Sequence, residues 1–429
     1  MVLDEKILSY IWQYQVFEHQ NLKTTEGHLI KVLHVGTKNH HSGADFSQSS
    51  LIINGLEWFG DIEIHVKSSD WFLHQHHKNK AYNSVILHVV WENDKNALRT
   101  DNTFIPTLEL KKIVDYQIIE KWNNLELSTS SIPCASQWEK VESLYKHSML
   151  DKMLLQRLER KSSKIRALLH QTNNDWEKTA YQWFVRHFGF KVNNEAFEQL
   201  ANSVPLKAIQ HHADQILQLE ALLFGQSGLL PKRDEAEDSY IEAIYKEYRF
   251  LSHKFDIANK QMQRHQWKFA HLRPANFPTL RIAQLAAFLH QSPRFFSQFL
   301  FLNDLDELRK FFQVQVSSYW QHHYHFYKKT DQHTAKLGKQ SIDSLIINVV
   351  IPLLAAYSTE KNESIFLERC IQFLEKMPAE INNTTKLWAE IGLKIKNAAD
   401  AQASLELYQD YCQHKKCLDC QIGVRLMRE

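Results

Sequence analysis

The sequence predicts an α/β domain over residues 1–135, followed by a larger all-α domain over residues 136–429. Short runs rich in β-branched residues, typical of strands, occur before about residue 110. After about Trp138 the apolar residues recur with helical periodicity instead. A chain of 429 residues also exceeds the length that one average core supports.

The first domain combines one opening helix with a mixed sheet that is flanked by helices. The dipeptide Asn54-Gly55 is a strong hairpin signal, and Val85–Trp91 is almost continuously apolar, as in a strand buried on both faces. In chain order we expect a helix in 3–17, strands in 28–35, 51–53 and 56–66, a short helix from Ser69-Asp70 to 76, strands in 85–91 and 104–110, and a helix in 112–122.

The second domain shows helical periodicity without strand alternation. No repeat of fixed period is present, so the pattern does not predict a helical solenoid. The expected helical segments are 149–170, 175–188, 213–224, 236–255, 279–290, 341–357, 361–375 and 401–412.

Composition and charge narrow the function classes. The formal net charge is +2, so a nucleic-acid surface has to be a local patch. The longest apolar run, Leu345–Tyr357, is shorter than a membrane span and contains a proline, and the N-terminus does not resemble a signal peptide. Five cysteines do not form a secreted disulfide framework. We therefore expect a cytoplasmic protein without membrane contact.

The strand that follows the hairpin carries the residues with the clearest chemistry. Glu63 and His65 are two residues apart on this strand, so their side chains project from the same face. Asp45 lies ahead of the first strand of the hairpin. In an unbroken hairpin, Asp45 would lie opposite Ile64 and point away from them. A one-residue bulge at Gly60, or an equivalent break near Asp45, would let Asp45 face His65. We expect such a break and a Mg²⁺ or Mn²⁺ site at Asp45 and Glu63, and the equal alternative is a polar, solvated sheet face.

Further histidines follow His65 in the sequence and are expected close to the same edge of the sheet. Imidazoles favour zinc, manganese or iron over magnesium, so His74 and His76 could add ligands for a different metal or for a binuclear site. A surface role for these two side chains is an equal alternative. His88 lies within an apolar strand, where a hydrogen-bonded core histidine is expected.

Three cysteines near the C-terminus have metal-ligand spacing. Cys412, Cys417 and Cys420 lie within nine residues, and a closed site needs a fourth ligand. Cys134 is the expected fourth ligand, with His414 as an alternative, and it would then tie the two domains together. Zinc and an iron–sulfur cluster both fit the spacing, and unligated thiols are the remaining alternative. Cys370 is expected in the core.

Two groups of basic residues could contact phosphate. Arg264, Lys268, Arg273 and Arg281 lie among aromatic residues, around a proline-rich loop that would expose the arginines for nucleic-acid binding. The other group lies on one expected helix, 149–170, where we interpret it as an ordinary solvated face: Arg157, Arg160, Lys161, Lys164 and Arg166.

The sequence resembles a bacterial family known as domain of unknown function 2851. The resemblance rests on Gly43-Ala44-Asp45-Phe46, Gly60-Asp61-Ile62-Glu63-Ile64-His65, Ser69-Asp70-Trp71, His74-x-His76, Tyr82-x-x-Val85-Ile86-Leu87-His88-Val89-Val90, Arg273-Pro274-x-Asn276-Phe277-Pro278 and the C-terminal cysteines. Ala44 replaces the proline that the family usually shows. No activity comes with this resemblance.

A looser resemblance is to the PD-(D/E)XK nucleases, which have the restriction-endonuclease-like fold. It implies that Asp45 and Glu63 bind magnesium, with the Ile64 carbonyl as a further ligand. His65 then stands where the family has a lysine. An imidazole can act as a base or ligate a metal, but it does not supply lysine's fixed charge.

These features favour a metal-dependent nuclease that hydrolyses phosphodiester bonds in DNA or RNA, with His65 assisting the water. One alternative is a non-catalytic nucleic-acid-binding or scaffold protein that keeps the nuclease-like fold, and another is a metal-dependent small-molecule hydrolase. The sequence lacks a phosphate-binding P-loop, a serine-hydrolase elbow and a His-Glu-x-x-His motif, which disfavours those chemistries.

Overall fold

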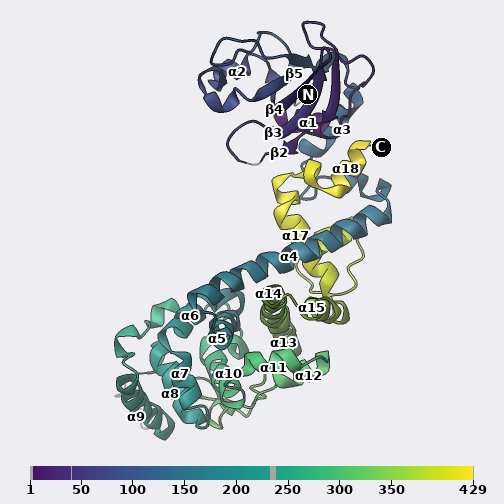
Figure 1. Ribbon diagram of the computed structural model, residues 1–429. Helices are drawn as coiled ribbons and strands as arrows, with labels where there is room; N and C mark the ends of the chain where they lie inside the picture. The colour runs from purple at the N-terminus through teal and green to yellow at the C-terminus, as the bar shows by residue number, and fades with distance from the viewer. Residues whose placement is uncertain (1–2, 40, 232–237, 429) are drawn as a thin grey trace. The chain divides into compact units, whose positions relative to one another are not determined.

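The computed structural model describes residues 3–39, 41–231 and 238–428, and it divides into two compact units (Figure 1). Unit 1 comprises Met1–Lys152, Asn382–Lys394 and Ser404–Glu429; unit 2 comprises Met153–Ile381 and Ile395–Ala403. From the sequence we predicted two consecutive domains, 1–135 and 136–429. The observed division differs, because the C-terminal segment Ser404–Glu429 belongs to unit 1.

Unit 1 is built on a mixed sheet, as expected. The strand order is β1-β3-β4-β5-β6, and β2 pairs with β3 at the side. The neighbours β1, β3 and β4 are antiparallel, whereas β4, β5 and β6 are parallel. The strands are β1 (Ile30–His34), β2 (Thr37–Lys38), β3 (Phe46–Ile53), β4 (Leu56–Lys67), β5 (Val85–Glu92) and β6 (Thr107–Glu109).

Helices cover this sheet because each has one apolar face. In α1 (Glu5–Gln13), Asp4 caps the first turn by accepting a hydrogen bond from the Ile7 amide at 3.1 Å, and Ile7, Leu8, Ile11 and Trp12 are fully buried. The helix α1 packs on β4, and α18 (Gln421–Arg428) lies beside α3 (Tyr116–Glu126) (Figure 1). The other helices of this unit are α2 (Asp70–Leu73) and α16 (Asn383–Glu390).

The β3–β4 hairpin contains the expected break near Asp45. Asn54 and Gly55 have φ of +51° and +80°, as a two-residue primed turn requires. The register then shifts by one residue between Phe46 and Ser49. The extra residue lies in β3, where Gln48 has φ of +59°. The expected break is therefore confirmed, but its placement at Gly60 is wrong.

Gly60 serves a different purpose in β4. A Cβ atom at this position would lie 2.3 Å from the Ser84 carbonyl oxygen and 2.5 Å from Ile86 Cγ2. The glycine therefore permits the chain that enters β5 to approach β4 closely. This approach lets β5 pair in parallel with the strand that carries Glu63 and His65.

Unit 2 is mostly helical. Its helices are α5 (Trp176–Phe188), α6 (Phe190–Ser203), α7 (Leu206–His211), α8 (Ile216–Ser227), α9 (Ser239–Lys254), α10 (Pro278–Gln291), α11 (Phe295–Phe301), α12 (Leu305–Phe311), α13 (Lys339–Leu345), α14 (Ile351–Lys361) and α15 (Ser364–Lys376). Two helices have residues in both units, α4 (Ser143–Gln171) and α17 (Ala398–Asp410). A small antiparallel pair, β7 (His323–His325) and β8 (Lys328–Lys329), corrects the all-α expectation.

The segment Lys339–Lys361 is one continuous helical run of 23 residues, longer than the apolar run Leu345–Tyr357 that it contains. Its length and composition would allow a span, but 78% of its apolar window is buried. This burial is typical of a core helix. The run contains a π-helical turn, Ile346–Val350, directly before Pro352.

We expect Gly60→Ala to lower the free energy of unfolding by about 1–3 kcal/mol, because the new methyl group overlaps backbone and side-chain atoms. Urea denaturation of the purified protein measures this change. Phe59→Ala is a matched control on the same strand, since Phe59 is 72% exposed and its loss should change stability by about 0.5 kcal/mol or less. Equal effects of the two substitutions would contradict the proposed role of Gly60.

Candidate functional site

The shifted register brings Asp45 beside Glu63. Phe46 pairs with Ile62, so Asp45, one residue earlier, lies opposite Glu63. The Asp45 amide donates to Glu63 Oε2 at 3.2 Å, and Asp45 Oδ2 accepts from the Ile64 amide at 2.9 Å. Asp45 therefore faces Glu63, and not His65 as the sequence pattern suggested.

Glu63 and His65 do project from one face of β4, but that face is buried. Glu63 is 6% exposed and His65 is 1% exposed. His65 Nε2 lies 3.7 Å from Glu63 Oε1. The face is therefore a protected interior site and not a solvated sheet surface.

The segment after β4 adds two more imidazoles to this face. The short helix α2 ends at Leu73, and Gln75 takes a left-handed conformation with φ of +60° before the next turn. His74 Nδ1 lies 3.1 Å from His65 Nε2, and His76 Nε2 lies 3.1 Å from Glu63 Oε1. The ligand atoms of His65, His74 and His76 all lie within 4.8 Å of one another.

These separations match those between ligands that share one cation. Ligand atoms on a tetrahedral metal stand about 3.3 Å apart when the bonds are about 2.0 Å long, and those on an octahedral metal about 3 Å apart. The His76–Glu63 pair has this spacing, yet His76 Nε2 has no aligned hydrogen-bond partner. A buried ring nitrogen without a partner, aimed beside a carboxylate, is suited to a metal ion.

His88 forms a hydrogen bond with the ring of His65. It is fully buried in β5, and its Nε2 lies 2.8 Å from His65 Nδ1. The expectation of a hydrogen-bonded core histidine is confirmed. When His65 binds a cation through Nε2, its Nδ1–H can donate to His88, which fixes the ring as outer partners do in metal sites.

Burial makes the charged forms of these groups unfavourable. Burial, and then the charge of Asp45, raises the pKa of Glu63 to about 9. Burial also raises the pKa of Asp45. It lowers the pKa of His65 to about 2, with further lowering from His88, His76 and His74. A divalent cation would compensate the carboxylate charge and bind the neutral imidazoles.

The sequence pattern missed two charged residues of this site. Burial and then the charge of Asp45 raise the pKa of Glu5, at the start of α1, so Glu5 lies near the cluster. Lys38, in β2, lowers the pKa of Asp45 and lies 3.8 Å from Asp419. No local spacing indicated either residue, because α1 and β2 approach the site only through the fold.

A family model described as "Protein of unknown function (DUF2851)" matches residues 5–383. This match covers more than half of the chain. The chain belongs to this family. No curated protein and no solved structure matches it. In this DUF2851 protein, the carboxylates and imidazoles of the candidate site lie within the matched residues, whereas three of the four clustered cysteines lie beyond them.

The four cysteines of this DUF2851 protein meet in unit 1. Cys134, Cys412, Cys417 and Cys420 are buried, and all four line one cavity of about 20 Å³. Both segments that carry them belong to unit 1, so the centre closes this unit and does not join two domains as we had expected. Cys370 is fully buried elsewhere, in α15, as expected for a core residue.

Burial makes the thiolate forms of these cysteines unfavourable, while two backbone amides near Cys420 favour its thiolate. Burial raises the pKa of Cys134 to about 12 and also raises the pKa values of Cys412 and Cys417, with further raising from neighbouring thiols. The amides of Gly423 and Ile422 donate to Cys420, at the beginning of α18. Such N–H···S hydrogen bonds stabilise a metal-bound thiolate.

The predicted nucleic-acid residues of unit 2 do not form one exposed set. Arg264, Lys268 and Arg273 are exposed. Arg281 is 6% exposed, so its expected exposure is wrong. The Arg281 guanidinium donates to Gln284, Asn276 and Ser341 and lies 4.4 Å from the centre of the Phe190 ring. Its burial follows from its position in α10, which is buried on all sides from Pro278 to Leu289.

We expect His76→Gln to weaken Mn²⁺ binding by at least about tenfold, because it removes a nitrogen aimed at the cluster. Isothermal titration calorimetry of metal-free protein measures the affinity. His77→Gln is the matched control, since its neighbouring ring packs on Phe72 outside the ligand group. The same loss in both variants, or in neither, would argue against this site.

Proposed function

We propose that this protein is a metal-dependent phosphodiesterase that cleaves DNA or RNA at the centre formed by Asp45, Glu63, His65, His74 and His76. One observation carries the proposal: oxygen and nitrogen atoms from β4 and from the segment that follows it converge at ligand spacing, with Glu63, His65 and His76 buried and His74 exposed. The mixed sheet, entered by a helix and followed by parallel strands, supports a PD-(D/E)XK-like topology.

The donor set favours manganese or another transition metal over magnesium. Three imidazoles accompany the carboxylates, and magnesium prefers oxygen ligands and retains several waters. Mn²⁺ accepts both nitrogen and oxygen ligands. A bound cation of this kind lowers the pKa of a coordinated water and stabilises negative charge on a phosphate.

The protein residues take separate roles in this proposal. Asp45 and Glu63 would hold the cation, and the His65–His88 hydrogen bond fixes one imidazole. Lys38 supplies the positive charge near Asp45 that His65 does not provide at neutral pH. Lys38 thus replaces the lysine that is expected at position 65.

A non-catalytic scaffold is the second candidate. It is favoured by the hydrogen bonds that already join Asp45, Glu63 and Ile64, since such pairing can fix a fold without any reaction. The two candidates differ in their response to a conservative change at Glu63.

We expect Glu63→Gln to reduce Mn²⁺-dependent cleavage of labelled single- and double-stranded DNA and RNA by at least about 100-fold, since it removes a charged metal ligand. Glu57→Gln, an exposed change on the same strand, should retain full activity. Thermal unfolding checks that both variants fold.

Wild-type protein that cleaves none of these substrates with Mn²⁺ or Mg²⁺ would overturn the nuclease proposal in favour of the scaffold. Hydrolysis of a small phosphodiester such as bis-(p-nitrophenyl) phosphate without cleavage of nucleic acid would instead indicate a small-molecule hydrolase.

The cysteine centre is proposed to hold an iron–sulfur cluster with a structural role. Among the described residues, no three of these sulfurs form a group with all separations within 4.8 Å. Sulfurs that bind a single zinc ion stand about 3.8 Å apart, given Zn–S bonds of about 2.3 Å. A cluster of several iron atoms accepts more widely spaced thiolates.

We expect protein purified without oxygen to contain iron and acid-labile sulfide, and Cys417→Ser to lose both. Cys370→Ser is the control, because Cys370 lies apart from the other four. Zinc at one equivalent, lost in Cys417→Ser, would contradict the cluster while retaining the site. Protein that contains neither metal would support unligated thiols.

A further inference from the structure

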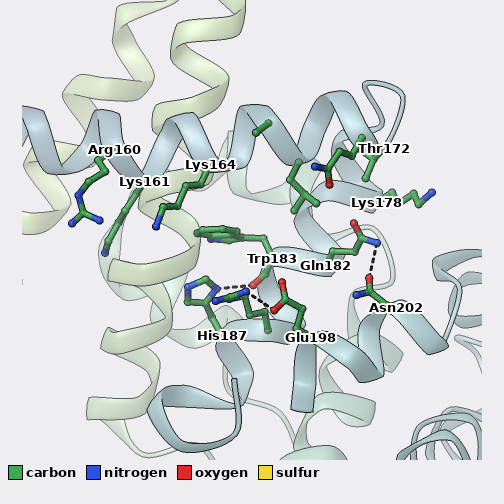
Figure 2. A pocket seen from close by; sticks show the side chains of 14 residues that line it. Arg160, Lys161, Lys164, Thr172, Lys178, Gln182, Trp183, His187, Glu198 and Asn202 are labelled. Atoms are coloured by element: carbon green, nitrogen blue, oxygen red, sulfur yellow. Dashed lines mark hydrogen bonds and ion pairs between the residues drawn. The ribbon is translucent and has the colours of Figure 1, made fainter. Parts of the chain in front are cut away.

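A large cavity lies in unit 2, apart from the two centres described above. It has a volume of about 670 Å³, within the range of small-molecule sites, and lies between α4, α5 and α6 (Figure 2). A second cavity of about 240 Å³ adjoins it, because His187 lines both.

The charge of the larger cavity is strongly one-sided. Among the fourteen residues that line it, all within the described part of the chain, five are lysine or arginine and one is a carboxylate. That carboxylate, Glu198, is paired with Arg186. Three basic residues of the helix 149–170, which we interpreted as an ordinary solvated face, line this cavity: Arg160, Lys161 and Lys164.

The basic side chains of α4 lie along one wall. Figure 2 shows Lys161 and Lys164 extending from α4 toward the level of the Trp183 ring, whereas Lys178 points away. Lys161 Nζ donates to Asn348 Oδ1 at 2.9 Å, which holds that side chain in place. Lys164 is exposed and can contact an anion in the cavity.

A local break in helical structure fixes the aromatic wall. Pro352 has no N–H, so it does not donate to the Asn348 carbonyl as residue i+4 of an α-helix would. The π-helical turn lies at this point, and Trp183 Nε1 donates to the Asn348 carbonyl at 3.0 Å. The indole is therefore held by its edge, through Nε1. Single π-helical turns are frequent at functional sites.

His187 adds a neutral polar group beside the indole. Its ring centre lies 4.5 Å from that of Trp183, and its Nδ1 lies 2.8 Å from the Trp183 carbonyl oxygen. Nδ1 is therefore the protonated nitrogen of the neutral ring. Burial lowers the pKa of His187 to about 4, so Nε2 can accept a hydrogen bond at neutral pH. Gln182 and Asn202, joined at 3.2 Å, add amide groups to the lining.

We propose that this cavity binds a nucleoside phosphate, with the phosphate on the lysines of α4 and the base on Trp183 near His187. Planar bases stack on indole rings, and lysine and arginine bind phosphate oxygens. The amides and the imidazole acceptor can read the polar edge of a base. The same chemistry is presented by a free nucleotide and by one nucleotide of a single strand.

Equilibrium binding to the full chain tests the proposal with three probes, each measured at two salt concentrations. The probes are ADP and inorganic pyrophosphate, followed by calorimetry, and a fluorescein-labelled single-stranded octadeoxynucleotide, followed by anisotropy. ADP or the strand should bind saturably and more tightly than pyrophosphate. Binding of ADP identifies a free nucleotide as sufficient, whereas binding of the strand alone identifies a nucleotide within a chain.

Four variants locate the binding. Lys164→Gln should weaken it about tenfold, whereas Lys207→Gln, an equal charge change at an exposed position outside the cavity, should leave it unchanged. Trp183→Ala should weaken ADP more than pyrophosphate. Glu198→Gln should tighten binding, because it releases Arg186 and removes the carboxylate.

The proposal is overturned if no probe binds saturably, or if Lys164→Gln and Lys207→Gln have equal effects. Pyrophosphate binding as tightly as ADP would overturn the role of Trp183. The expected result for Glu198→Gln is tighter binding, which a misfolded protein would not show. This variant therefore tests the site even if Trp183→Ala does not fold. Cleavage is not measured here, so failure of this site is distinct from failure of the nuclease proposal.

Discussion

The arrangement of unit 1 depends on the register of β4 between its two neighbours. A slip of one residue along a strand exchanges its two faces, so the extra residue at Gln48 decides what stands opposite Glu63. On the other side, β5 pairs in parallel because Gly60 leaves room for the chain at Ser84. The carboxylates, His65 and His88 reach their positions through these two constraints.

Local signals predicted much of this unit and little of its long-range assembly. The Asn54-Gly55 turn, the apolar strand β5 and the same-face pair Glu63 and His65 follow from short-range rules. Gln48 takes a left-handed conformation. A glycine at this position would have indicated such a conformation in the sequence, whereas a glutamine does not. The sequence indicated that a break was needed, but we placed the break at Gly60, a glycine of the partner strand.

The missed residues share one physical reason. Asp45 raises the pKa of Glu5, and Lys38 lowers the pKa of Asp45, although these residues lie on separate elements. No periodicity in a linear sequence reports a contact between separate elements. For Arg281 the error is the opposite one. Because it follows a proline-rich loop, we predicted an exposed arginine that binds nucleic acid, but the side chain is buried. The folded chain buries it against Phe190, and its two terminal nitrogens donate to neutral partners.

Two groups of buried ligands in unit 1 have the same electrostatic problem. Burial opposes the carboxylate form of Glu63 and the thiolate forms of the clustered cysteines, and neighbouring acidic groups add to this cost. A cation at each centre would offset it, and would thereby couple metal binding to the stability of the unit.

The most direct measurement of the central claim is a crystal structure of the protein grown with Mn²⁺, with anomalous data collected at the manganese edge. The account predicts one anomalous peak within about 2.0–2.3 Å of Glu63 Oε1 and of a ring nitrogen from each of His65 and His76. A map without manganese at this position, with the Glu63 and His76 side chains as close to each other as they are here, would contradict it.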